Sequence, residues 1–218
     1  MTTKEHPDGK VVEQSLPQGA TSPAQSVDES RRRFGKSGLA AGGVIITLAS
    51  RPVLGAWACQ SPSGFQSGNV SSHGQPTTCM GRTPGYWGNK PEEWPLPYKA
   101  GTCVGDANYC NHPENWTTTN ATLFRNKFNC SGGGSIYYNY TMFKVIWLGG
   151  GGDPDQLGAH IVSALLNAKM GWTSPVLTEQ AVKDMFNDWA SKGYYEPSAG
   201  IKWYGADIVT YLKTTMTL

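Results

Sequence analysis

The residues of this 218-residue chain that could catalyse a reaction or bind a metal form no recognisable motif. Beyond residue 58 the histidines are His73, His112 and His160, and with Asp153 or Glu114 they offer ligands of the kind that zinc prefers. Their spacing, however, matches no metal-binding motif. The sequence also contains no G-x-S-x-G, H-E-x-x-H or EF-hand pattern. We therefore predict no catalytic residue, no metal and no cofactor.

The cysteines carry the strongest chemical expectation. An oxidising compartment would join four of the five into two disulfides and leave one unpaired. Only six residues separate Cys103 from Cys110, a spacing short enough to close a small loop, but the sequence does not fix the pairing. The leftover thiol has no evident base beside it, so a cysteine nucleophile is not supported. The five cysteines are Cys59, Cys79, Cys103, Cys110 and Cys130.

Residues 1–58 read as an export leader. After a polar stretch that we expect to be disordered, Ser30–Lys36 (SRRRFGK) resembles the twin-arginine motif S-R-R-x-F-L-K, with Gly35 where leucine is usual. A short apolar run and an A-x-A site follow, as in a signal peptide. The resemblance implies export by the twin-arginine (Tat) machinery. The residues predicted to form this signal are Arg31, Arg32, Phe34, Lys36, Ala56 and Ala58.

Two alternatives for the leader stay open. It could remain uncleaved as an anchor, although its apolar run is short for a membrane span. Cys59 could also carry a lipid, because it directly follows Ala58, but the usual lipobox leucine is missing. We expect cleavage after Ala58, no membrane span in residues 59–218, and a protein in the periplasm, at the cell surface or in the medium.

Removing the leader changes the charge of the protein. Residues 1–58 hold 7 of the 18 basic and 5 of the 16 acidic residues, so residues 59–218 carry 11 of each. A neutral domain lacks the basic patch that nucleic acid or an anionic membrane attracts. Aromatic residues are abundant instead, which fits either core packing or an exposed surface for sugars or subunits.

Helical signals are confined to the second half. Asp153 is a good N-cap, Pro154 suits a first helical position and Gly171 a C-terminal stop, which predicts a helix between them. Asp153 and Asp155 could also bind Ca²⁺ weakly, but the capping interpretation is favoured. Two further helices are predicted over residues 178–192 and 204–215.

These patterns predict one exported domain over residues 59–218. Its first part, 59–135, is rich in Pro, Gly, Ser, Asn and Thr, which favour loops. Its second part, 136–218, reads as helical. We therefore predict a mainly α fold: a small helical bundle with an irregular, loop-rich N-terminal cap tied by disulfides.

Two stretches together resemble a module of secreted bacterial proteins. Residues 83–95 (TPGYWGNKPEEWP) resemble the module's segment TPGYWKNHPEAWP, and residues 157–168 (LGAHIVSALLNA) resemble its later helix LAHQLIAALLNA. This chain departs at Gly88 and Lys90, where lysine and histidine are usual. The resemblance implies export and a shared fold, and no activity.

The binding candidates come from these two stretches: Tyr86, Trp87, Trp94, His160 and Asn167. His160 and Asn167 are seven residues apart, so they lie on nearly one helix face, and structural roles are favoured for both. The leading hypothesis is a non-enzymatic surface, envelope or extracellular-assembly protein that acts through protein contacts or self-assembly. The alternatives are a polysaccharide-binding module that uses exposed aromatics such as Trp87 and Trp94, and a metal-dependent extracytoplasmic enzyme.

Overall fold

Helices make up most of this protein, in a computed structural model that describes residues 59–67 and 78–217. None of the helices within those ranges has the length and hydropathy that a bilayer crossing requires. The leader, with its predicted cleavage site, lies outside the described residues and stays a prediction. The candidate residues outside the described ranges are Arg31, Arg32, Phe34, Lys36, Ala56, Ala58 and His73.

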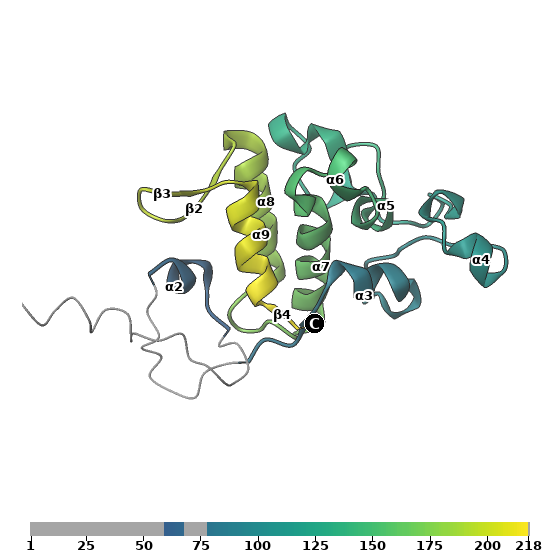
Figure 1. Ribbon diagram of the computed structural model, residues 1–218, viewed down its shortest axis with the longest axis horizontal. Helices are drawn as coiled ribbons and strands as arrows, with labels where there is room; N and C mark the ends of the chain where they lie inside the picture. The colour runs from purple at the N-terminus through teal and green to yellow at the C-terminus, as the bar shows by residue number, and fades with distance from the viewer. Residues whose placement is uncertain (1–58, 68–77, 218) are drawn as a thin grey trace, which may run out of the picture. The chain divides into compact units, whose positions relative to one another are not determined.

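The longest helices lie in the second half of the chain (Figure 1). Helix α7 is central to their packing, because α3, α5, α8 and α9 all contact it. The bounds are α3 (Pro84–Asn89), α5 (Met142–Ile146), α7 (Leu157–Lys169), α8 (Glu179–Lys192) and α9 (Gly205–Thr214). The prediction of a mainly helical fold is confirmed.

Helix α7 is buried on every side along most of its length. All residues from Leu157 to Asn167 are buried, which is why this helix is apolar almost all round rather than along one stripe. Gly158 permits the closest approach of its neighbours. A Cβ at this position would come within 2.6 Å of the Tyr137 ring and 2.7 Å of Val145.

The ends of α8 and α9 follow from local capping. The Thr178 side chain accepts a hydrogen bond from the Ala181 N–H, and Gly193 ends α8 in the left-handed conformation with φ 82°. Helix α9 begins after Tyr204, whose N–H donates to the Asp207 carboxylate at 3.0 Å. Both helices lie within a residue of their predicted ranges.

The predicted start of α7 is wrong. A 3₁₀ turn, η6 (Pro154–Gln156), comes first, and α7 begins only at Leu157. Asp155 and Gln156 both have φ 58°, and this left-handed pair turns the chain back on itself. Asp153 still caps the helix, but from a distance: its carboxylate accepts hydrogen bonds from Gly158 N–H and Ala159 N–H, both at 2.9 Å.

Two smaller elements flank the long helices. The four glycines before Asp153 make one helical turn, α6 (Gly149–Gly152). The segment after α8 is an antiparallel hairpin of β2 (Tyr195–Ser198) and β3 (Ile201–Trp203). Gly200, with φ 79°, lies in the two-residue connection between its strands.

Residues before 135 form short elements rather than only loops. Strand β1 pairs in parallel with β4, so the segment just before α3 is hydrogen-bonded to the C-terminal end of the described chain. The bounds are α2 (Pro62–Ser67), β1 (Gly81–Arg82), η2 (Pro91–Glu93), α4 (Ala107–Cys110), η3 (Pro113–Asn115), η4 (Phe124–Asn126), η5 (Gly132–Tyr137) and β4 (Met216–Thr217).

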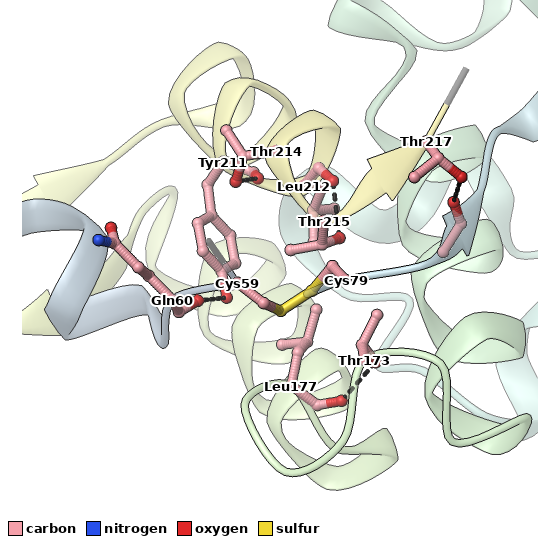
Figure 2. The surroundings of a disulfide bond; sticks show 11 residues. Cys59, Gln60, Cys79, Thr173, Leu177, Tyr211, Leu212, Thr214, Thr215 and Thr217 are labelled. Atoms are coloured by element: carbon pink, nitrogen blue, oxygen red, sulfur yellow. Dashed lines mark hydrogen bonds between the residues drawn. A yellow bond between two sulfur atoms is a disulfide. The ribbon is translucent and has the colours of Figure 1, made fainter. Parts of the chain in front are cut away.

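Two disulfides tie these short elements down. Cys59 pairs with Cys79, Cys103 pairs with Cys110, and Cys130 is the free cysteine. Figure 2 shows the Cys59–Cys79 bridge beside Tyr211 of α9, whose hydroxyl donates to the Gln60 carbonyl at 2.9 Å. The first described residues are therefore tied to the segment just before β1 by the disulfide, and to α9 by the Tyr211 hydrogen bond.

The close packing at Gly158 yields a test. Gly158→Ala should lower the free energy of unfolding by about 2 kcal/mol, because overpacking a core costs about 1–3 kcal/mol and exceeds the gain in helix propensity. Gly151→Ala is the matched control, since nothing lies within 4 Å of its added Cβ. Urea denaturation measures both variants. Equal stability of the two would contradict the packing of α7 described above.

Candidate functional site

The two stretches that resemble the secreted module touch each other through Asn167. Its side-chain oxygen accepts hydrogen bonds from the Arg82 backbone N–H at 2.8 Å and from Trp87 Nε1 at 2.9 Å. Its amide nitrogen donates to the Arg82 carbonyl at 2.9 Å. Asn167 is fully buried, so these bonds replace the water that the amide loses on folding. Asn167 therefore holds β1 and α3 against α7 through these hydrogen bonds, and we call this contact the Asn167 clamp.

Trp87 and Trp94 are not exposed, contrary to the polysaccharide hypothesis. Trp87 has no exposed surface and stacks on Trp172, with ring centroids 5.5 Å apart. Trp94 is 7% exposed and donates from Nε1 to the Trp87 carbonyl at 3.0 Å. Both indoles are held in the core by hydrogen bonds of their N–H groups, so neither presents a face to a sugar.

Tyr86 is half-buried and lies beside these tryptophans. Its hydroxyl donates to the Glu93 carboxylate, and the Arg82 guanidinium lies over its ring, 5.1 Å from the centroid. The hydrogen bond to Glu93 is the largest cause that raises the pKa of Tyr86. These contacts orient the ring along α3.

His160 is a buried, hydrogen-bonded residue of α7. Its Nδ1 lies 2.8 Å from the Gln156 carbonyl. Burial lowers the pKa of His160 below its ordinary value, while the bond to Gln156 acts in the opposite direction. This environment favours a neutral imidazole and fits the structural role expected for it.

Asp153 is the other buried titratable group near the start of α7. The Tyr137 hydroxyl donates to its carboxylate at 2.6 Å, in addition to the two backbone N–H groups of α7. Burial raises the pKa of Asp153, and the hydrogen bonds that it accepts lower it. Burial, and then the hydrogen bond to Asp153, raise the pKa of the Tyr137 hydroxyl. Asp153 therefore acts as a cap and a tie between η5 and α7.

The structure does not gather the candidate metal ligands. Within residues 59–67 and 78–217, no three His, Cys, Asp or Glu side chains are close enough to hold an ion. His112 pairs with Glu114 at the surface, with 3.2 Å between Nδ1 and the carboxylate oxygen. His160 lies in the core on a different element.

The described surface contains a groove of about 260 Å³. Three parts of the chain line it: the α3–η2 stretch, the loop closed by the second disulfide, and aromatic residues that follow. We call it the Trp147 groove. Its lining residues are Gly88, Asn89, Pro91, Glu92, Cys103, Ala107, Cys110, Asn111, Trp116, Phe143 and Trp147.

Trp147 is the most distinctive residue of the groove. It follows α5 directly, and its side chain is 39% exposed. The indole lies against Gly88, where an added Cβ would come within 2.8 Å of the ring. A second hollow, of about 190 Å³, borders Trp147 as well and is lined by α3, Gln156 and Ala159. Trp147 therefore borders both hollows.

Another part of the groove lining is closed by a disulfide. Cys103 and Cys110 lie 5.7 Å apart at Cα, and both line the groove. Asp106 caps the short helix inside the loop by accepting from the Tyr109 N–H at 2.8 Å. Trp116 donates from Nε1 to the Cys110 carbonyl at 2.8 Å, which joins the loop to the aromatic wall. The groove is thus a preformed surface.

Sequence reasoning missed Trp147. It lies at the end of an apolar run whose other members are mostly core residues, so its pattern does not set it apart. The one usable signal was Gly88, because a residue without a side chain leaves room for a large neighbour. Chemically, the groove offers an aromatic face, two amides and one carboxylate, which suits binding.

Comparison with known proteins adds no name to this site, because no family model, curated protein or solved structure matches the chain.

Asn167→Ala should lower the free energy of unfolding by about 3 kcal/mol, because it leaves the buried Trp87 Nε1 and the Arg82 backbone groups without a hydrogen-bond partner. Asn187→Ala is the control, since its side chain accepts only from Asn129 N–H, near the surface. The decrease in the free energy of unfolding for Asn187→Ala should stay below about 1 kcal/mol. Urea denaturation of both variants measures the difference, and a loss at Asn167 no larger than at Asn187 would refute the clamp.

Replacing Cys103 and Cys110 together by serine should lower the free energy of unfolding by about 2 kcal/mol, the effect of freeing a short loop. It should also increase the mobility of the groove wall. Thermal denaturation measures the first effect and amide hydrogen exchange of residues 103–116 the second. Unchanged exchange in that segment would show that the disulfide does not shape the groove.

The buried His160 predicts a pH dependence. The pKa of His160 is lower in the folded protein than the ordinary value of about 6.5 that applies to the unfolded chain. Below about pH 6.5 the unfolded chain therefore binds a proton more readily, and the free energy of unfolding decreases as the pH is lowered. His160→Asn keeps an N–H for Gln156 and removes the titration. The variant should therefore lose less free energy of unfolding than the wild type between about pH 7.5 and about pH 5.5. A loss equal to that of the wild type would mean that His160 does not contribute.

Proposed function

We propose that residues 59–218 form an exported, non-enzymatic protein that acts outside the cytoplasm through contacts, and that the Trp147 groove is its contact site. The observation that carries this proposal is the partly exposed Trp147, which borders two hollows, one of them also lined by the Cys103–Cys110 disulfide. Exposed aromatic residues in preformed clefts are typical anchors of recognition.

Export is supported by two independent features. The twin-arginine-like stretch, residues 30–36, precedes the first disulfide-bonded residue, Cys59, in the sequence, and both disulfides suit an oxidising compartment. The sulfur of Cys59 is bonded to Cys79, so it has no thiol to carry a lipid. This favours a cleaved and released protein over a lipoprotein.

The same proposal includes the finer description of the fold. Helices α8 and α9 both pack on α7, which supports a small helical bundle, and the two disulfides lie in the part that precedes it. In this arrangement the bundle supplies stability and the disulfide-tied cap supplies most of the groove. Contacts then form at the cap, away from the α7–α9 core.

Intact mass spectrometry of the protein recovered from its host tests export. We expect a chain that starts near Cys59 and is lighter by four hydrogen atoms than its reduced form, because two disulfides form. Reduction should restore those four hydrogens. A full-length chain with free thiols would contradict the proposal.

Photo-crosslinking in the host tests the contact site. A photoreactive aromatic amino acid at position 147 should yield a discrete crosslinked species, because this side chain faces the groove. The same amino acid at position 138 is the control, since Tyr138 is 51% exposed and does not line the groove. No product at 147, or the same product at both positions, would contradict a contact role for the groove.

A further inference from the structure

We infer that the Trp147 groove binds one neutral pyranose ring of a glycan, with the sugar face stacked on the Trp147 indole. The inference rests on the proposed function, because it names the ligand of the same groove. It differs from the polysaccharide hypothesis drawn from the sequence, which relied on Trp87 and Trp94. Those two indoles are buried, and a different residue provides the aromatic face.

The indole of Trp147 has the features that a sugar ring requires. One side rests on Gly88, and the side chain keeps 39% of its surface exposed. A pyranose presents a patch of C–H groups that can lie flat on such a ring and gain dispersion contacts. Trp147 Nε1 has no hydrogen-bond partner among the described residues, unlike the indole nitrogens of Trp87, Trp94 and Trp116. No hydrogen bond within the described residues occupies this donor, although its edge of the indole lies near Gly88.

The rim of the groove matches hydroxyl groups. Asn89 donates to the Gly85 carbonyl at 2.9 Å, which leaves its side-chain oxygen as an acceptor. The Asn111 amide makes no side-chain hydrogen bond within the described residues, so it can both donate and accept. Glu92 is paired only loosely with Lys90, at 3.9 Å, and its carboxylate can accept as well. Hydroxyls act as donors and acceptors, so this mixed rim suits them.

The volumes of the two hollows suit one sugar ring in each. Sites for drug-sized ligands occupy about 300–1,000 Å³. The groove, at about 260 Å³, is smaller, and the adjoining hollow has about 190 Å³. Because Trp147 borders both, a glycan chain can cross the indole with neighbouring sugars on either side.

The charge of the groove lining favours a neutral glycan over an acidic glycan or a phosphate. Glu92 is the single charged residue in the lining, and no lysine, arginine or histidine lines the groove. An anionic ligand would meet this carboxylate, and the nearest cation, the Lys90 ammonium 3.9 Å from Glu92, is not part of the lining. None of the lining residues belongs to a strand, so the groove also offers no strand edge on which an extended peptide could add.

The test uses the disulfide-bonded protein purified from its host. It is first screened on an array of neutral and acidic oligosaccharides. The strongest neutral hit, and the methyl glycoside of its terminal sugar, are then titrated while the ¹⁵N-labelled indole N–H signals are followed. We expect the Trp147 Nε1–H signal to shift, with a dissociation constant for the methyl glycoside on the order of 1 mM.

Three variants separate binding from folding. Trp147→Ala should weaken binding of the oligosaccharide at least tenfold, and Trp147→Phe should recover part of it, because a smaller aromatic face remains. Tyr138→Ala, which changes an exposed aromatic residue outside the groove, should bind as the wild type does. Unchanged thermal unfolding of each variant shows that the fold is intact.

The outcomes distinguish this inference from the proposed function. Silence on the array with an undisturbed Trp147 signal overturns the glycan inference, and a persistent crosslink at position 147 would keep the contact site. Binding of acidic glycans alone, of a peptide instead, or binding unaffected by Trp147→Ala also overturns the inference. Absence of both glycan binding and crosslinking would remove the proposed function with it.

Discussion

The buried amide of Asn167 is the interaction on which the arrangement of the N-terminal half depends. Because Asn167 is buried on α7, its oxygen and nitrogen have only the Arg82 backbone and Trp87 Nε1 as partners. Losing any one of these bonds would leave a polar group without water, which makes the arrangement strongly preferred over its alternatives. Trp87 in turn accepts from Trp94 through its carbonyl, so one side chain of α7 orients the whole TPGYWGNKPEEWP stretch.

The groove is a consequence of this clamp and of a second tie. Trp87 is followed directly by Gly88 and Asn89, so fixing α3 against α7 also fixes that wall of the groove. At the other end of α7, Asp153 accepts from Tyr137 and from the helix N–H groups, which offsets the cost of burying its carboxylate. Trp147 lies between Tyr137 and Asp153 in sequence, so the hydrogen bond of that pair ties together the two ends of its chain segment.

Local signals in the sequence predicted the local structure well. Thr178 and Gly193 mark the ends of α8 because capping depends on neighbouring residues alone. The start of α7 failed because Asp153 bonds across a left-handed pair, which no propensity encodes. Asn167 and Trp147 depend on contacts between distant segments. The sequence shows Trp87 and Gly88, but it does not show that Trp87 bonds to Asn167 or that Gly88 contacts Trp147.

Hydrogen exchange of the indole N–H groups tests this account most directly. The Trp87 indole is buried and bonded to Asn167, whereas the Trp147 indole is exposed and has no partner among the described residues. The account predicts that Trp87 Nε1–H exchanges only through global unfolding, and that Trp147 Nε1–H exchanges nearly as fast as in a free peptide. Comparable rates at the two positions would contradict the buried clamp and the open aromatic face together.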